Sequence, residues 1–221
     1  MKVISVHAIS LDGAIASDTV ESDDQRMNYG LTSTEDQIRV EQLMKQSDAV
    51  ITGSNSLVSE GVAREVKNTR GKNVSWYIYT NKGLPSNLDF WSQKNIERYL
   101  ISESDLKDKY EKGLFESSGV NNLIYEKSHP AEFLIRHLQE KNTQQVLLFG
   151  GGTINKIFFE KNLVSHLEYT ICPTILGGFK RVNLIQAGLT HPNTAKLMHT
   201  EAVSNHVFLT YELNNTSSLL K

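Results

Sequence analysis

The sequence contains very little cysteine and no long apolar run, and both absences limit what the protein can be. Cys172 is the one cysteine among 221 residues, which excludes an internal disulfide. No apolar stretch approaches the length that a membrane-spanning helix needs. The N-terminal segment MKVISVHAISLDG has a single lysine and no extended apolar core, unlike a secretory signal. We therefore expect a cytoplasmic protein with no membrane partner.

An excess of positive charge is also missing. The 23 Lys and Arg residues are outnumbered by 25 Asp and Glu residues, so the net charge does not favour nucleic acid as a partner. The seven histidines form neither an HxH nor an HExxH pattern, and no carboxylate stands at ligand spacing beside them. We expect no metal site. Each lone histidine, His7 included, is interpreted as a surface or satisfied core residue.

Apolar segments rich in β-branched residues alternate with helical patterns along the chain. We predict strands at 3–9, 49–52, 74–80, 97–102, 121–126, 144–149, 167–176 and 206–213. Helices are predicted over 35–46 and 130–141, and after the glycines at 150–152. This alternation indicates an α/β fold with a largely parallel central sheet flanked by helices. The strand-rich C-terminal third indicates antiparallel pairing at one edge, hence a mixed sheet.

Local signals set several boundaries within this arrangement. A polar loop is predicted up to about Tyr29. Thr32 and Glu35 then fit a capping box that opens the first predicted helix. Pro173 interrupts the strand predicted at 167–176. The last residues, NNTSSLLK, are expected to fray.

Three consecutive glycines, Gly150, Gly151 and Gly152, stand where a strand gives way to a helix in LLFGGGTINKIFFEKN. Free N–H groups at a helix start attract anions, and a backbone without Cβ atoms can approach a pyrophosphate closely. Thr153 adds a hydroxyl donor. The segment matches neither GxGxxG nor GxxxxGK[ST]. A phosphate cradle and a glycine turn that serves packing alone both stay open.

Two further strand ends carry similar residues. AVITGSNS, 49–56, places Thr52 and Gly53 after an apolar strand, and the two turns could meet on one ligand at the carboxyl edge of the sheet. YTNKG, 79–83, ends another strand with Thr80, Asn81 and Lys82. The lysine could hold a monophosphate such as the 2′-phosphate of NADPH, or it could be an ordinary solvated turn residue.

Three segments resemble one known family. SLDGAIA at 10–16, ITGSNSL at 51–57 and LLFGGGTINKIFFEKNLVSHLEYTICPTILGG at 147–178 resemble the reductase domain of the riboflavin biosynthesis deaminase/reductase. The similarity runs in order from about Val3 to Leu213. No HxE or CxxC zinc motif of a deaminase is present, so the resemblance implies a stand-alone reductase. Its domain would span residues 1–214, followed by a C-terminal tail at 215–221.

The resemblance implies a single-domain dihydrofolate reductase-like fold, usually a homodimer, with NADPH as cofactor. It implies reduction of the ribose of 5-amino-6-(5-phosphoribosylamino)uracil to a ribityl chain. Matching positions imply cofactor contacts at Ala8, Ser56, Thr80, Gly151, Gly152, Thr153, Ile154 and Asn155. They imply substrate contacts at Asn28, Thr32 and Ser33. Asp12, the acidic residue of the family's DG motif, would be the catalytic group as proton relay or orienter; it could instead cap its own turn.

Several substrate positions depart from the family pattern. Phe149 stands where an acidic residue is common, and Met44 stands near a usual arginine. The DDP motif is absent, with Arg64 and Lys67 as possible substitutes. These departures favour, as a second hypothesis, a related enzyme that reduces a pterin or another small imine. A third is a nucleotide-binding protein without turnover.

Overall fold

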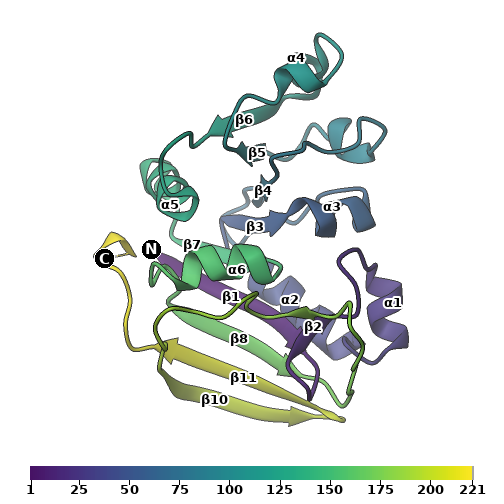
Figure 1. The fold of residues 1–221 in the computed structure, drawn as a ribbon, viewed down its shortest axis with the longest axis vertical. Coiled ribbons are helices and arrows are strands. Elements are labelled where there is room, and N and C mark those ends of the chain that lie inside the picture. The colour runs from purple at the N-terminus through teal and green to yellow at the C-terminus, as the bar shows by residue number, and fades with distance from the viewer. Residues whose placement is uncertain (221) are drawn as a thin grey trace.

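A nine-stranded sheet forms the middle of the molecule, with helices on both faces (Figure 1). In a computed structural model that describes residues 1–220, the strand order is β10-β11-β8-β1-β7-β3-β4-β5-β6. The seven strands from β8 to β6 pair in parallel, whereas β11 pairs antiparallel with both β8 and β10. The predicted mixed, mostly parallel α/β sheet with an antiparallel C-terminal edge is therefore confirmed.

The elements of this sheet and its helices follow one another closely along the chain. The strands are β1 (Lys2–Ile9), β2 (Ala14–Ala16), β3 (Ala49–Gly53), β4 (Ser75–Tyr79), β5 (Arg98–Ser102), β6 (Val120–Ile124), β7 (Gln145–Phe149), β8 (His166–Ile171), β9 (Val182–Asn183), β10 (Ala195–Val203) and β11 (His206–Leu213). The helices are α1 (Asp23–Asn28), α2 (Thr34–Lys45), α3 (Ser54–Glu60), α4 (Leu114–Ser118), α5 (Pro130–Glu140) and α6 (Gly152–Phe159), with short 3-10 turns η1 (Asp89–Trp91), η2 (Lys107–Lys109) and η3 (Ser218–Leu220). The strands β2 and β9 form a separate two-stranded sheet.

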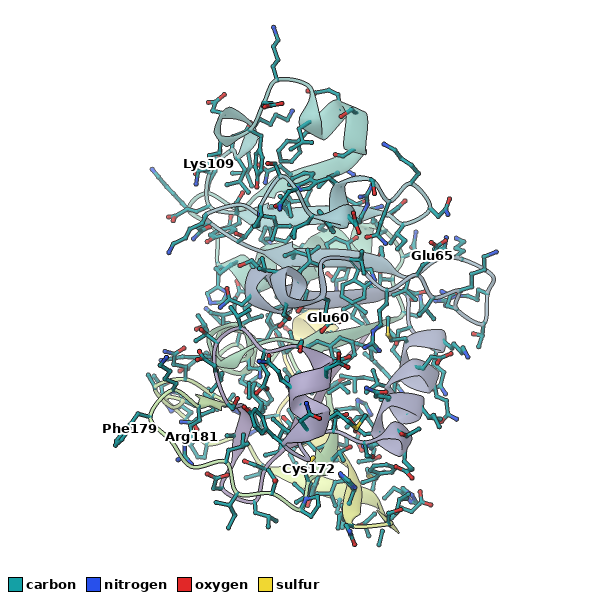
Figure 2. All side chains as sticks on the ribbon, turned by 90° about the vertical axis from the view of Figure 1, so that its right-hand side faces the viewer. Glu60, Glu65, Lys109, Cys172, Phe179 and Arg181 are labelled. Atoms are coloured by element: carbon teal, nitrogen blue, oxygen red, sulfur yellow. The ribbon has the colours of Figure 1, made fainter. Side chains whose placement is uncertain are left out.

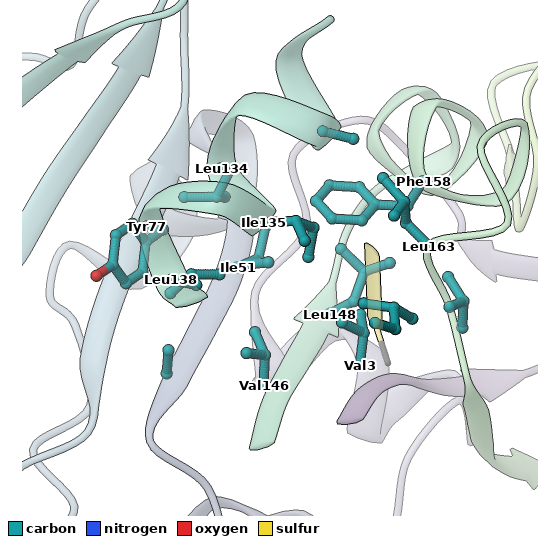
Figure 3. Packing of buried hydrophobic residues seen from close by; sticks show 14 of the residues in the cluster. Val3, Ile51, Tyr77, Leu134, Ile135, Leu138, Val146, Leu148, Phe158 and Leu163 are labelled. Carbon is teal, nitrogen blue, oxygen red and sulfur yellow. The ribbon is translucent and has the colours of Figure 1, made fainter. Parts of the chain in front are cut away.

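Hydrophobic side chains cover both faces of the central strands. Successive strand residues point to opposite faces, so Val50 packs under α2 and α3 while Ile51 packs under α5 and α6. Figure 3 shows the cluster that contains Ile51; Leu134 of α5, Phe158 of α6 and Leu148 of β7 belong to it as well. Burial on both faces explains why the parallel strands read as nearly continuous apolar runs in the sequence.

Some predicted boundaries are wrong. The capping box at Thr32 and Glu35 does not form, because α2 starts one residue later: Ser33 is its N-cap and accepts a hydrogen bond from the Asp36 N–H at 3.2 Å. The strand predicted at 167–176 ends at Ile171. Beyond that point Pro173 offers no N–H for the sheet ladder.

The C-terminal tail does not fray as expected. Leu220 is buried in the same cluster as Ile51 and Leu148, and its carbonyl accepts a hydrogen bond from the Met1 ammonium at 2.9 Å. The two ends of the described chain therefore meet on one face of the sheet; Lys221 lies outside the described residues. No helix within residues 1–220 is long and apolar enough to cross a membrane.

Several elements had no clear signal in the sequence, among them β2, α1, α3 and β10. The predicted polar loop before Tyr29 contains β2 and α1, and the helix α1 begins with a capping box formed by Ser22 and Gln25. The short helix α3 follows β3 directly. The edge strand β10 is exposed along almost its whole length, so it lacks the apolar alternation on which the strand predictions relied.

Candidate active site

A cavity of about 690 Å³ opens where β1, β3 and β7 end. The strands β1 and β7 pair only as far as Ser5 and Leu148, although β1 continues to Ile9. Beyond this last pair the two strands separate, and Val6, His7 and Ala8 line the cavity. The volume lies within the range of small-molecule and cofactor sites.

The two glycine-containing turns predicted to meet on one ligand do lie side by side here. The strands β3 and β7 are parallel neighbours, with Thr52 opposite Phe149, and each leads into a helix. Both turns contribute to the wall of the cavity, through Thr52, Gly53, Ser54, Asn55, Ser56, Phe149, Gly150, Gly151, Gly152, Thr153 and Ile154. The first N–H groups of a helix have no partner within the helix, so this wall is suited to an anion.

The three glycines of the run differ in what surrounds them. A Cβ at Gly150 would come within 2.7 Å of Asn155 Oδ1, and one at Gly152 would come within 2.5 Å of the Asn183 carbonyl. A Cβ at Gly151 would meet nothing within 4 Å. The packing interpretation therefore holds for Gly150 and Gly152, whereas Gly151 leaves an open approach to the turn.

The third turn, predicted to hold a phosphate, is not part of the cavity wall. Thr80 Oγ1 both accepts from the Gly83 N–H and donates to its carbonyl, each at 3.0 Å, so the hydroxyl closes its own turn. Asn81 and Lys82 are exposed beside it, and none of the three lines the cavity, although the preceding Tyr79 does. The lysine therefore gives no support to the choice of NADPH over NADH.

Asp12 fastens its turn to the loop after β8. Its carboxylate accepts hydrogen bonds from Ser10 Oγ at 2.6 Å and from the N–H groups of Leu176 and Gly177 at 3.1 and 2.9 Å, and it forms an ion pair with Arg181. These hydrogen bonds, that of Ser10 above all, hold its pKa well below the usual range. Asp12 does not line the cavity, but Arg181 does, on the loop that also carries the exposed Phe179 (Figure 2).

We expect Asp12→Asn to lower the free energy of unfolding at neutral pH, because an amide cannot replace the ion pair. A carboxylate whose folded pKa is lowered stabilises the protein fully above its unfolded pKa of about 4, and this contribution fades as the pH falls toward the folded value. Urea unfolding of the wild type and of Asp12→Asn should therefore show a difference in the free energy of unfolding that is constant above about pH 5. This difference should narrow below about pH 4. Asp108→Asn, at an exposed aspartate, is the control. An equal difference at pH 7 and pH 3 would contradict this role.

The residues predicted to bind substrate divide between the cavity and the surface. Thr32 lines the cavity floor with Asp36 and Met44 of α2, and its hydroxyl donates to Asp36 Oδ2 at 2.8 Å. Ser33 is the N-cap of α2 and Asn28 ends α1; neither lines the cavity.

The two cations proposed as substitutes for the DDP motif have different positions. Arg64 lines the cavity and forms an ion pair with Asp23 at the start of α1. The Asp23 N–H also donates to Glu60 at the end of α3, labelled in Figure 2, so α1 is tied to α3 by two residues that line the cavity. Burial and the nearby Asp23 raise the pKa of Glu60. Lys67 lies in a bridge with Asn73 and does not line the cavity.

Several wall residues were not predicted from the sequence. His7 was interpreted as a lone histidine, and Arg26 belongs to the unpredicted helix α1. Asn183 ends β9, and Gln186 lies in the loop that follows; the Gln186 N–H donates to the Gly152 carbonyl at 3.1 Å. His7 could have been found, because it directly precedes Ala8 on a strand that ends at the predicted ligand edge.

The sequence shows which protein family this chain belongs to. The sequence profile of the RibD C-terminal domain matches residues 1–209. The chain belongs to this family. The riboflavin biosynthesis protein RibD of Actinobacillus pleuropneumoniae is 24% identical over 219 residues, a match that covers 95% of this chain and 56% of that protein. The chain therefore spans just over half the length of this RibD relative.

Solved structures of RibD-related proteins have the same fold. A pyrimidine reductase-like protein from Corynebacterium diphtheriae superposes with a TM-score of 0.76 at 13% identity, over 97% of this chain and 92% of that one. A deaminase/5-amino-6-(5-phosphoribosylamino)uracil reductase from Thermotoga maritima gives a TM-score of 0.72 at 18% identity, over 96% and 56%. At these identities the likeness bears on the fold alone.

Proposed function

We propose that this RibD-family chain is an NADPH-dependent reductase that acts on 5-amino-6-(5-phosphoribosylamino)uracil. The observation that carries the proposal is the convergence of two strand-to-helix turns, 52–56 and 149–154, on the cavity at the carboxyl edge of the sheet. Helix starts and glycine backbone at such an edge suit the pyrophosphate of a dinucleotide.

The residues at the cavity fit this cofactor. Gly151 leaves open space in front of the second turn, which a Cβ would partly fill. Ser56 and Thr153 bring hydroxyl groups to the same wall, although that of Thr153 also donates to Gln186 Oε1 at 2.8 Å. The open edge of β1 at Ala8 would face the nicotinamide. NADPH, when bound, supplies the hydride, and the chain supplies binding and orientation.

The substrate side of the cavity supports a second candidate. Phe149 and Met44 both line the cavity, and neither side chain carries the charge that is common at these positions in the family. A less polar wall favours a pterin or another small imine over a phosphorylated sugar. The same fold and cofactor site would serve either substrate.

Turnover of NADPH with purified protein and the phosphoribosylaminouracil tests the proposal, with NADH measured in parallel. We expect NADPH oxidation that depends on the substrate, followed by absorbance, and a higher kcat/KM than with NADH. Turnover only on a pterin or another imine would select the second candidate. Saturable NADPH binding by fluorescence, without oxidation on any of these substrates, would indicate a nucleotide-binding protein. Without NADPH binding the proposal fails.

A further inference from the structure

His7 stands at the point where β1 leaves β7. It follows the last pair of these strands by two residues and lines the cavity, while its backbone remains paired with Tyr169 of β8 on the other side. The imidazole packs edge-on against the Tyr169 ring, with 5.9 Å between ring centroids and 60° between planes. The ring is therefore held in place on one side and borders the cavity on the other.

One hydrogen bond determines which imidazole nitrogen carries the proton. Asn155 Nδ2 donates to the Leu184 carbonyl at 2.9 Å, so the amide nitrogen must point this way. The same Nδ2 lies 3.1 Å from His7 Nε2. An amide nitrogen only donates, so Nε2 must accept, and the proton of a neutral imidazole then lies on Nδ1.

The Asn155 amide has little freedom to turn away from this arrangement. The residue is fully buried in the first turns of α6, and its Oδ1 has no hydrogen-bond partner within residues 1–220. A Cβ at Gly150 would come within 2.7 Å of that oxygen, so a glycine is needed where the strand turns past it. The packing of the glycine run therefore holds Asn155 against His7.

The Nδ1 atom of His7 is free to meet a ligand. It has no hydrogen-bond partner in the described part of the chain, and it is not among the polar atoms sealed from solvent there. Because His7 borders the cavity, an N–H at this atom is available to a molecule bound inside.

The charges around His7 keep the ring neutral. Burial above all, together with the positive charge of Arg26 on α1, lowers its pKa to about 3, and the Asn155 hydrogen bond opposes these two effects only in part. Tyr169 is the titratable group packed on the ring from β8, and burial raises its pKa, so it stays neutral as well. At neutral pH His7 therefore cannot supply a proton as an imidazolium.

We propose that His7 is a ligand-binding residue of the cavity that donates a neutral Nδ1–H hydrogen bond to a carbonyl oxygen, with Asn155 as its positioning residue. The nature of that carbonyl rests on the proposed function, in which the nicotinamide carboxamide and the pyrimidine ring both offer one. An uncharged donor suits a neutral acceptor, and a fixed N–H aimed at a carbonyl can polarise it without a proton transfer. Asn155, matched to a cofactor-contacting position in the sequence, would then act on the ligand through His7.

Nitrogen-15 NMR of the histidine rings tests, in the free protein, whether His7 is the neutral Nδ1–H tautomer. We expect the His7 signals of a neutral Nδ1–H tautomer throughout pH 5 to 8, with His7→Asn used to assign them. Signals of an Nε2–H tautomer or of an imidazolium in this range overturn the proposal. This measurement needs no ligand, so it decides the tautomer whether or not the chain is a reductase.

Addition of NADP⁺ alone, and of the phosphoribosylaminouracil alone, identifies the acceptor. A shift of the His7 ring signals with the first places the carbonyl on the cofactor, and a shift with the second places it on the substrate. Saturated binding of both molecules without any shift overturns the contact. If neither molecule binds, as measured by fluorescence, the proposed function is overturned. The NMR signals of the free protein still show whether the His7 proton lies on Nδ1.

Two variants separate the hydrogen bond from the packing of the ring. The amide nitrogen of His7→Asn lies near the place of Nδ1 and retains a donor, whereas His7→Leu retains bulk alone. We expect the leucine variant to lose about 100-fold in kcat/KM, the lower end of the loss on removal of one aimed donor, and the asparagine variant to retain most of it. Asn155→Leu should lower kcat/KM and change the His7 tautomer signals together. Equal kcat/KM for wild type and His7→Leu rejects the proposal.

Discussion

Gly152→Ala is expected to destabilise the protein by about 1–3 kcal/mol and to weaken NADPH binding by at least about tenfold, because the new methyl group must displace backbone. Its Cβ would come within 2.5 Å of the Asn183 carbonyl and 3.0 Å of the Gln186 nitrogen. Both residues line the cavity, and the Gln186 N–H also donates to the Gly152 carbonyl. The substitution therefore moves part of the cavity wall away from the helix start.

Gly151→Ala is the matched variant one residue earlier. The backbone at Gly151 has φ −69° and ψ 171°, which alanine adopts without strain, and the added Cβ meets nothing within 4 Å. We expect the free energy of unfolding to change by less than about 1 kcal/mol. The methyl group would, however, stand in the open space before the turn, so NADPH binding should again weaken by about tenfold.

Urea unfolding and fluorescence titration with NADPH measure the two effects separately. The expected pattern is loss of stability and binding in Gly152→Ala, and loss of binding alone in Gly151→Ala. Unchanged NADPH affinity in Gly151→Ala would mean that the phosphates do not approach this turn. Unchanged stability in Gly152→Ala would mean that β9, which carries Asn183, moves without cost.

The sequence was sufficient to predict the parts of the site that depend on strand order. An apolar run that ends in Thr52 and Gly53, and another that ends at the glycine run, must expose their last residues at the same edge if both strands are parallel. The structure confirms this because β3 and β7 are direct neighbours. The local residue pattern and the parallel direction of the strands are enough to place these two turns at one edge of the sheet.

Side-chain orientation after a strand could not be predicted in this way. Thr80 directly follows β4, the next parallel strand, yet its hydroxyl bonds back to Gly83 and does not line the cavity. The N–H groups that donate to the Asp12 carboxylate come from a loop more than 160 residues away, which local pattern does not reveal. The same holds for His7, whose orientation depends on Asn155 from another element.

Arg98→Met is the second substitution for which we expect a large effect. Arg98 is 1% exposed at the start of β5, and its guanidinium donates to the carbonyls of Ile96, Phe90 and Ser118. These carbonyls come from the segment before β5, from η1 and from the end of α4, so one side chain joins the segments around β5. Methionine keeps the bulk but leaves all three carbonyls without this donor.

An unsatisfied buried acceptor costs about 1–3 kcal/mol, and relaxation of the loops recovers part of the loss, so we expect Arg98→Met to lower the free energy of unfolding by about 2–4 kcal/mol. Urea unfolding measures this change. Lys94→Met is the control, since this exposed cation donates to the Ser117 carbonyl next to one of the same acceptors. The cavity lies mainly on the other strands, so NADPH affinity of the folded Arg98→Met protein should stay within about threefold of wild type. A stability change below about 1 kcal/mol would show that water replaces the guanidinium, as it can only if the site opens to solvent.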